Sequence, residues 1–458
     1  MGHLTRQLTL ALSAPESLDP IIFSLSGALP TVAAAIADGR LPELADRSVR
    51  TEYCPSRLSG WLPARGPLRA ARSRYPQYAW EPYLRDRLRA LVAETGARAV
   101  VFDGVVPYDG LLEARKALPG IAFIWQRRGM WRPGIGASWL ARSTDFDLVI
   151  EPGDFAGDDG PTADRDDAVH VAPISITSVL GPQDRETAAA ALGLDPERKT
   201  LLLNPGLGAV GQVETPARVA IAELYRRDPS WQVAVTSPAI AQHTLGLGGD
   251  AGGEGAGRAD VVLLRDTYPL ARSLAAFDAA IGAAGYNSVH ELLGSQIPTL
   301  LIPSLVGTDD QAARARRLAR AGYCLMASNT DPSAIRAGVS RLVDDHERDR
   351  LRDACAELPT PDGGLTAAAL VADLAGAAPG PSATLADEYG PPRWRRSVID
   401  LRTPVTLGPA RPGVRHLEVT ADLPTDLRGG DPVEHLVAGS SPEYARVRQD
   451  VAEWIYRF

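Results

Sequence analysis

Lysine and cysteine are scarce in this sequence of 458 residues. Lys116 and Lys199 are the only lysines, so nearly all the positive charge is carried by arginine, the residue better suited to bidentate phosphate contacts. The three cysteines are odd in number and scattered, which argues against a disulfide framework and against a zinc site. No apolar run is long enough to span a membrane and no secretory signal opens the sequence, so we expect a cytoplasmic protein.

Positive charge is also the minority charge overall. The 48 Lys and Arg residues are outnumbered by 56 Asp and Glu residues, and this net charge of −8 argues against a nucleic-acid-binding surface. Hydrophobic residues make up 45% and charged residues 23% of the chain, as is typical of globular domains. The length and composition predict two or three domains with separate hydrophobic cores.

Short apolar runs alternate with helical patterns over the first 375 residues, which predicts an α/β fold with parallel sheets. We expect an N-terminal domain at residues 1–180 and a second domain at 195–375. Residues 376–458 are expected to form the last region of the chain. It begins with a linker, the Ala/Gly/Pro-rich stretch Ala375–Pro392, and continues as a C-terminal extension that ends in a helix. The first domain lacks the strand that normally precedes the first helix, predicted here over Leu4–Leu12.

Polar residues follow several predicted strands of the first domain. Ligands of parallel α/β sheets bind beyond the carboxyl ends of the strands, where Asp103, Arg127 and Arg128 are expected. Gly2 and His3 stand at the position of a strand-to-helix turn, so the His3 side chain could face the ligand-binding cleft beyond the strand ends. The alternatives are a frayed N-terminus for His3, a turn-forming Asp at position 103, and a solvated loop for the two arginines.

The most informative stretch of the second domain is Phe277–Cys324. It reads as a strand, a glycine-rich turn, a helix from Tyr286, a strand at Pro298–Ile302 and a second helix near Asp309. A glycine-rich turn that leads into a helix offers unpaired N–H groups and the positive end of the helix dipole, which together bind anions. A second glycine-rich loop follows the predicted strand Thr200–Leu203 and is a weaker phosphate signal.

Two motifs in that stretch each have a structural and a functional interpretation. Ser288 and Glu291 have the spacing of a helix capping box. Asn287 and Ser288 equally suit hydrogen bonds to a phosphate, and the Glu291 carboxylate suits the paired hydroxyls of a ribose. The Asp310-Gln311 pair either caps a helix or binds sugar hydroxyls.

The order and spacing of these motifs resemble a known segment. Gly285-Tyr286-Asn287-Ser288-x-x-Glu291, the strand at Pro298–Pro303 and Asp310-Gln311 are similar to the donor-binding segment of GT-B glycosyltransferases. The similarity is to the families of the plant-type UDP-glycosyltransferases and the bacterial cell-wall lipid N-acetylglucosaminyltransferase. It implies two Rossmann-like parallel-sheet domains facing across a cleft. It also implies a hexosyltransferase that moves a sugar from a nucleotide diphosphate, with UDP-sugar as the expected donor, to an acceptor hydroxyl, inverting and without metal or cofactor.

The resemblance also implies a role for each site residue. His3 is the expected general base, with Asp103 as its partner; Gly2-His3 and Val101-Phe102-Asp103 match the corresponding family segments. Arg127 and Arg128, with the long loop at Ser56–Pro76, are expected on the acceptor side. The expected donor-binding residues are Gly206, Gly208, Gly285, Asn287 and Ser288 near the diphosphate, Glu291 on the ribose, and Asp310 and Gln311 on the sugar.

Several alternatives stay open at this stage. Ala283 and Ala284 stand where plant-type members have His-Cys, so contacts there must come from the backbone. A sugar-nucleotide epimerase can share the architecture, and a catalytically silent nucleotide-sugar-binding or scaffold protein is a further alternative. The acceptor is unidentified, whether small molecule, lipid-linked or glycan, and a peripheral membrane contact remains open. Thymine and guanine remain open beside uracil as the donor base.

Overall fold

The computed structural model describes residues 2–44, 47, 49–56, 77–157, 162, 165–204, 210–237, 261–265, 267–304 and 308–389. These residues belong to one compact unit, Met1–Pro392. Three predictions lie outside the described residues: the loop glycines Gly206 and Gly208, nearly all of the Ser56–Pro76 loop, and the C-terminal extension beyond residue 389.

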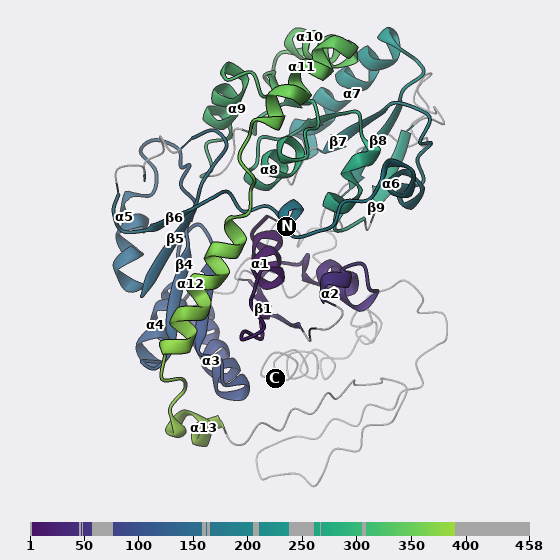
Figure 1. The fold of residues 1–458 in the computed structure, drawn as a ribbon. Helices are drawn as coiled ribbons and strands as arrows, with labels where there is room; N and C mark the ends of the chain where they lie inside the picture. Colours follow the sequence, from purple (N-terminus) through teal and green to yellow (C-terminus); the bar gives the residue numbers. More distant parts are fainter. Residues whose placement is uncertain are drawn as a thin grey trace, which may run out of the picture. The chain divides into compact units, whose positions relative to one another are not determined.

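The first half of the chain forms two parallel sheets, one with two strands and one with four (Figure 1). Its elements are α1 (Gly2–Leu12), β1 (Ile21–Ser24), α2 (Leu29–Ala37), the 3-10 turn Pro42–Leu44, β2 (Arg50–Tyr53), α3 (Gln77–Thr95), β3 (Ala99–Asp103), α4 (Asp109–Ala117), β4 (Ala122–Gln126), α5 (Ala137–Leu140), the 3-10 turn Ala141–Asp145, β5 (Leu148–Pro152), β6 (Val169–Val171) and the 3-10 turn Ile176–Ser178. The strand order is β1-β2 in one sheet and β3-β4-β5-β6 in the other.

Helix α1 contacts strands of both sheets. It contacts β1 and β3. Within the described residues, β1 pairs only with β2 and β3 pairs only with β4, so each has one edge without a partner strand. The apolar residues of β3 are accordingly only partly buried, whereas β4 is buried along its whole length. The frayed-terminus alternative is wrong, because α1 already begins at Gly2.

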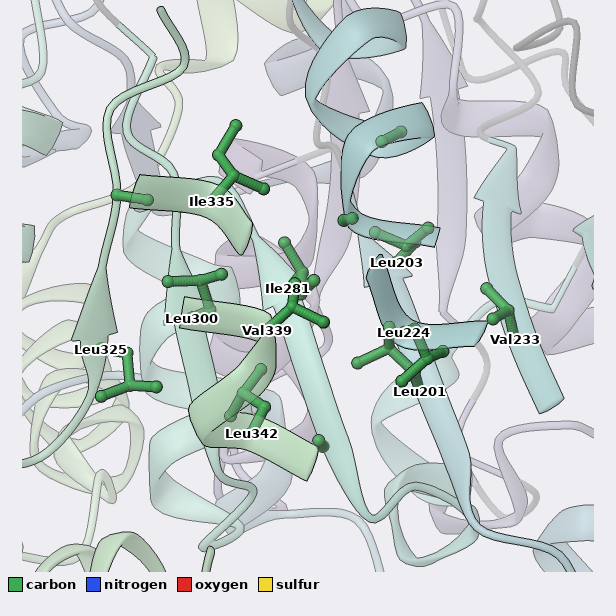
Figure 2. Close-up of a cluster of buried hydrophobic side chains, with 14 of the residues drawn as sticks. Leu201, Leu203, Leu224, Val233, Ile281, Leu300, Leu325, Ile335, Val339 and Leu342 are labelled. Atoms are coloured by element: carbon green, nitrogen blue, oxygen red, sulfur yellow. The ribbon is translucent and has the colours of Figure 1, made fainter. Parts of the chain in front are cut away.

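The second half forms one parallel sheet of six strands, in the order β12-β11-β10-β7-β8-β9. Its elements are α6 (Arg185–Leu192), β7 (Thr200–Asn204), α7 (Val210–Arg227), β8 (Gln232–Ser237), β9 (Val261–Arg265), the 3-10 stretch Leu270–Ala276, β10 (Ala279–Gly282), α8 (Tyr286–Gly294), β11 (Thr299–Leu301), α9 (Gln311–Arg320), β12 (Leu325–Met326), α10 (Pro332–Val343) and α11 (Asp345–Ala356). The aliphatic side chains of the central strands pack against α7 and α10 (Figure 2). Because both faces of the sheet are covered, β10 is buried at every residue.

The chain then returns to the four-stranded sheet. Helix α12 (Gly363–Ala377) contacts β3, β4, β6 and α1, although residues up to 375 were expected to belong to the second domain. The prediction of a plain linker over Ala375–Pro392 is wrong in part. Residues Ala383–Tyr389 form helix α13, which packs on α3, because Leu385 fits into the hydrophobic core beside that helix.

The predicted α/β fold class with parallel sheets is confirmed. Among the described residues, no helix is long and apolar enough to cross a membrane.

Candidate functional site

The first turn of α8 presents unpaired backbone donors. The turn between β10 and α8 is tight: a Cβ on Gly282 would lie 3.4 Å from the Asn204 carbonyl oxygen. Gly285 is the N-cap and has no side chain to cap the helix. In the described part of the chain, no hydrogen bond reaches the backbone N–H groups of residues 286, 287 and 288. Together with the positive end of the helix dipole, such N–H groups are suited to an anion.

The capping-box interpretation of Ser288 and Glu291 is wrong. Because Gly285 is the N-cap, Ser288 is the third helical residue and cannot cap the helix, and Glu291 lies one turn further on. The Ser288 hydroxyl makes no hydrogen bond to the described residues. Neither side chain is therefore committed to the helix terminus.

The first turn of α1 meets the first turn of α8. The Asn287 side-chain amide donates to the Gly2 carbonyl oxygen at 3.3 Å. Two helix N-termini therefore converge here, and the next residue of α1 is His3. His3 Nδ1 lies 2.6 Å from Asp103 Oδ1, at the carboxyl end of β3. The structure thus brings together three residues that are 100 or more positions apart in the sequence.

The His3–Asp103 contact fixes the tautomer of the imidazole. In neutral His3 the Nδ1–H donates to Asp103, which leaves Nε2 as the proton acceptor. The His3 side chain is 41% exposed and that of Asp103 is 1% exposed. Desolvation, together with the charges of Arg6 and Arg128, lowers the pKa of His3 and outweighs the opposing effect of Asp103. Such a group can accept a proton near neutral pH.

Arg128 lies on the open side of His3. Its Nη2 is 3.4 Å from His3 Nε2, and its Nη1 is 3.9 Å from Asp309 Oδ1. The backbone three residues further on is joined to the second half of the chain by an isolated antiparallel bridge between Trp131 and Asp309. Both side-chain contacts are long, so the guanidinium of Arg128 can turn its donors toward a ligand.

Arg127 does not share this position. Its side chain is fully buried, and its guanidinium pairs with Glu151 at 2.9 Å and Asp167 at 3.0 Å. It also donates to the Ser143 hydroxyl at 2.7 Å. Because all its donors face the protein interior, Arg127 has none left for an acceptor, and the prediction that places it on the acceptor side does not fit the structure.

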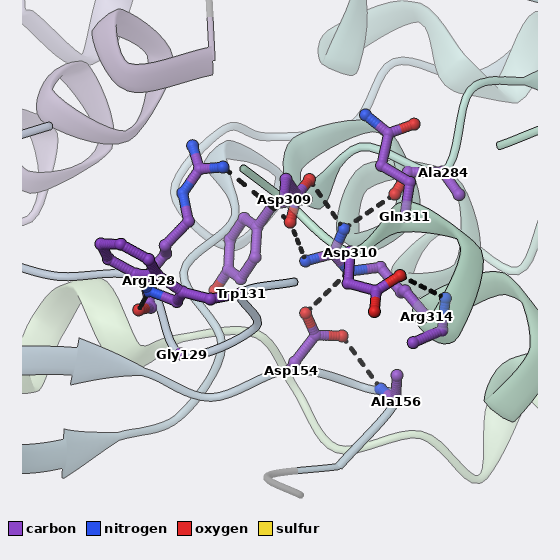
Figure 3. A network of polar contacts seen from close by, with 12 residues as sticks. Arg128, Gly129, Trp131, Asp154, Ala156, Ala284, Asp309, Asp310, Gln311 and Arg314 are labelled. Atoms are coloured by element: carbon purple, nitrogen blue, oxygen red, sulfur yellow. Dashed lines mark hydrogen bonds and ion pairs between the residues drawn. The ribbon is translucent and has the colours of Figure 1, made fainter. Parts of the chain in front are cut away.

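The Asp309–Gln311 segment is fixed by a buried network around Arg314 (Figure 3). The guanidinium of Arg314 donates to Asp154 at 2.8 Å and makes a bidentate pair with Asp309 at 2.9 and 3.0 Å. These two carboxylates hold the pKa of Arg314 above its usual range. The network therefore fastens α9, from the second half, to the segment that follows β5.

Among the described residues, Asp310 and Gln311 each have one polar side-chain atom in a hydrogen bond and one without a partner. Asp310 is the N-cap of α9 and accepts from the Ala313 N–H at 2.9 Å, so the capping interpretation holds for one of its oxygens. Gln311 Oε1 accepts from the Ser304 N–H at 3.0 Å. Gln311 Nε2 lies close to the α8 turn, 3.8 Å from where a Gly285 Cβ would stand.

Glu291 is the unpaired carboxyl of the site. It is partly buried on α8 and makes no hydrogen bond or ion pair within the described residues. Desolvation raises the pKa of Glu291 to about 7. A carboxyl kept from solvent with no protein partner suits a ligand that supplies donors, such as vicinal hydroxyls.

His290, beside Glu291, is a structural histidine. Its ring lies between Tyr286 and Phe155, with centroids 4.1 and 4.5 Å away. Nδ1 donates to the Tyr286 carbonyl oxygen at 2.7 Å, and Nε2 accepts from the Phe155 N–H at 3.1 Å. Both nitrogens are used only in the neutral form, and burial lowers the pKa of His290 to about 4.

We therefore expect His290 to make the protein acid-labile. Its pKa is 6.5 when unfolded and about 4 when folded, so the unfolded state binds the proton more tightly and stability falls as pH falls from 6.5 toward 4. The loss should reach roughly 3 kcal/mol. Urea unfolding of the wild type and of His290→Gln, each at pH 7 and pH 5, isolates this effect. An equal loss in both proteins would contradict it.

Sequence reasoning missed four residues that hold the site together: Arg6, Asp154, Tyr286 and Arg314. Arg6 had a local signal, because it lies one helical turn after His3 on the predicted first helix. Tyr286 contacts Gly153, and Arg314 pairs with Asp154 as well as with the nearby Asp309. The contacts with Gly153 and Asp154 join positions more than 100 residues apart, which no local spacing reveals.

Comparison with known proteins shows a similarity to glycosyltransferases. Residues 266–362 match the glycosyltransferase family 28 C-terminal domain. A relative from Clavibacter michiganensis subsp. michiganensis, a UDP-N-acetylglucosamine–N-acetylmuramyl-(pentapeptide) pyrophosphoryl-undecaprenol N-acetylglucosamine transferase, is 27% identical over 297 residues, which cover 64% of this chain and 76% of the relative. The same enzyme of Leuconostoc citreum is 29% identical over 178 residues, 38% of this chain and 47% of the relative.

Two solved structures also resemble this chain. The glycosyltransferase of kitacinnamycin is 18% identical, with a TM-score of 0.49 over 81% of this chain and 95% of that one. MurG of Acinetobacter baumannii is 13% identical, with a TM-score of 0.47 over 78% of this chain and 100% of that one. The family match spans the whole Phe277–Cys324 stretch and confirms its resemblance to glycosyltransferases. Residues 266–362 thus resemble the glycosyltransferase family 28 C-terminal domain, and the chain is similar over 297 residues to an N-acetylglucosamine transferase.

Proposed function

We propose that this protein transfers a sugar from a UDP-sugar to an acceptor hydroxyl with inversion at the anomeric carbon, and that His3 is the general base. One observation carries the proposal: the His3–Asp103 pair lies beside the unpaired first turn of α8. A proton acceptor and an anion site are thereby placed together, as an inverting transfer from a nucleoside diphosphate requires.

In the proposed reaction, the acceptor oxygen attacks the anomeric carbon as His3 Nε2 takes the hydroxyl proton. The bond from the anomeric carbon to the diphosphate oxygen breaks, and the nucleoside diphosphate leaves with the bonding electrons. Asp103 keeps the Nδ1–H of His3 in place and stabilises the imidazolium that forms. Arg128, 3.4 Å from Nε2, flanks the path of the acceptor.

The leaving diphosphate is assigned to the first turn of α8. Its backbone N–H groups, with the side chains of Asn287 and Ser288, offer donors to the phosphate oxygens as their charge increases. Glu291 is assigned to the ribose hydroxyls. The amide nitrogen of Gln311 and the second carboxylate oxygen of Asp310, which make no hydrogen bond within the described residues, are assigned to the sugar.

The relatives support a first choice of donor. Their names specify UDP-N-acetylglucosamine, so this nucleotide sugar heads a donor panel that also includes UDP-glucose, dTDP-glucose and GDP-mannose. The assay measures nucleoside diphosphate release with small-molecule, glycan and lipid-linked acceptors. We expect acceptor-dependent release with a UDP-sugar. Release of an epimerised sugar without acceptor, or donor binding in calorimetry without turnover, would contradict the proposal.

Replacing Glu291 by glutamine should weaken donor binding while stabilising the free protein. Loss of charge-assisted bonds to the ribose should raise the donor Kd about 10- to 100-fold. At pH 8 the folded protein no longer contains a partly buried charge, which should stabilise it by about 1–2 kcal/mol. Calorimetry with UDP and urea unfolding measure the two effects.

The pH dependence and a control complete the Glu291 test. Ribose hydroxyls donate best to the ionised carboxylate, so the wild-type Kd for UDP should fall as pH rises through about 7, and Glu291→Gln should lose this dependence. Glu357→Gln, at an exposed glutamate, is the matched control. If both variants bind UDP like the wild type, Glu291 does not contact the donor.

A further inference from the structure

Arg6 is a buried cation that the proposed chemistry leaves without a role. It lies on α1 one turn after His3, and only 4% of its surface is exposed. Its Nε donates to Asp103 Oδ2 at 2.9 Å and its Nη2 donates to Asp103 Oδ1 at 2.6 Å. Such a bidentate pair fixes both the position and the plane of a carboxylate.

The plane of Asp103 matters because one of its oxygens serves two partners. Oδ1 accepts from both His3 Nδ1 and Arg6 Nη2, whereas Oδ2 accepts from Arg6 Nε. A rotation of the carboxylate would break the Arg6 pair and the His3 contact together. Arg6 therefore determines which oxygen faces the imidazole.

The guanidinium of Arg6 also contacts the second half of the chain. Its guanidinium carbon lies 5.1 Å from the centroid of the Tyr286 ring, at the first helical residue of α8. That ring is fixed in turn: its hydroxyl donates to the Gly153 carbonyl oxygen and accepts from the Ile174 N–H, both at 2.9 Å. Arg314 lies over the same ring at 5.9 Å.

We propose that Arg6 is the positioning residue of the His3–Asp103 pair, which it holds in one geometry and fastens to the start of the donor helix through Tyr286. This inference depends on the proposed function, because it assigns a role toward the proposed base. Arg6 holds Asp103 by its bidentate pair, and its Nη2 also lies 3.0 Å from His3 Nδ1. Its contact with Tyr286 ties the base to the element assigned to the diphosphate.

The charge of Arg6 has a separate effect from its geometry. The charged groups that face His3 are Asp103 from β3, Arg6 from α1 and Arg128 from the segment after β4; Tyr286 and Asp309 in turn face Arg6. Without the Arg6 charge, Asp103 would hold a proton on His3 more strongly and raise its pKa. The base works only when unprotonated, so the acid limb of the rate profile would move to higher pH.

Two substitutions separate geometry from charge. Arg6→Met removes both, and we expect kcat to fall about 10- to 100-fold, the donor KM to stay within about threefold, and the acid limb to rise by about one pH unit. Arg6→Lys keeps the charge without the bidentate pair. It should lower kcat while leaving the acid limb near its wild-type position.

The control is Arg348→Met. Arg348 is also 4% exposed, donates to backbone carbonyls, and lies 5.0 Å from the Trp231 ring, away from the site. The rate profiles are measured with the UDP-sugar and acceptor that support fastest release. If Arg6→Met unfolds, its rate profile is replaced by an NMR titration of His3 in Arg6→Lys. The pKa of His3 in that variant is expected to equal the wild-type pKa, while kcat is still lowered.

The outcomes distinguish this inference from the proposed function. A wild-type kcat and acid limb in Arg6→Met, a loss confined to KM, or an equal loss in Arg348→Met would overturn the role of Arg6. If His3→Ala is also fully active, the proposed function fails as well. If His3→Ala is inactive while Arg6→Met is unimpaired, only the role of Arg6 fails.

Discussion

Replacing His3 by alanine is expected to lower kcat by about 10²- to 10⁴-fold, the usual contribution of a general base. Donor binding should be nearly unchanged, because the groups assigned to the diphosphate and ribose lie on α8 and not on the imidazole. Steady-state kinetics with a UDP-sugar and calorimetry with UDP measure the two effects. The rate that remains should lose the acid limb of its pH profile.

The control for this substitution is His170→Ala. His170 is an exposed histidine on β6 with no part in the site, and its loss should leave kcat unchanged. A wild-type rate in His3→Ala would remove His3 from catalysis. A loss of UDP binding equal to the loss of rate would instead assign His3 to the donor.

Replacing Arg314 by methionine is expected to destabilise the protein by about 3–5 kcal/mol, because it leaves two carboxylates buried without their cation. The side chains of Asp154 and Asp309 are 7% and 13% exposed. Arg314 also donates to the Ala284 carbonyl oxygen at 2.8 Å, in the turn that leads into α8. Donor affinity should therefore fall along with stability. Urea unfolding and calorimetry with UDP measure both.

The matched control lies on the same helix. Arg316 is exposed on α9, and Arg316→Met should change stability by no more than about 0.5 kcal/mol. Adding Asp154→Asn and Asp309→Asn to Arg314→Met should restore part of the stability, because the unpaired charges are then removed. Equal urea midpoints for the Arg314 and Arg316 variants would show that the buried network contributes nothing.

Much of the fold was predictable because its strands are apolar runs bounded by turn residues. The strand at Thr299–Leu301 and the helix from Tyr286 follow directly from composition and spacing. The course of the chain after residue 362 was not predictable. The apolar residues of α12 could have covered either sheet, and only their fit against β3, β4 and β6 decides which.

The site was predictable only where its residues follow their own strand or turn. Asp103 and Arg128 were placed by the strand-end rule, but the same rule gave Arg127 an equal chance. Arg127 is buried because Glu151 and Asp167, 24 and 40 residues on, pair with it from the neighbouring segment. Local sequence does not encode such pairs. The capping-box error has the same origin, since the N-cap depends on where the β10–α8 turn ends.

The central claim is that the two phosphates of a nucleotide sugar bind at the first turn of α8. A crystal structure with bound UDP tests it most directly. Phosphate oxygens are expected within hydrogen-bond distance of the backbone N–H groups of Asn287 and Ser288, with the ribose hydroxyls on Glu291. Diphosphate bound elsewhere, with the first turn of α8 untouched, would show that α8 does not bind the nucleotide sugar.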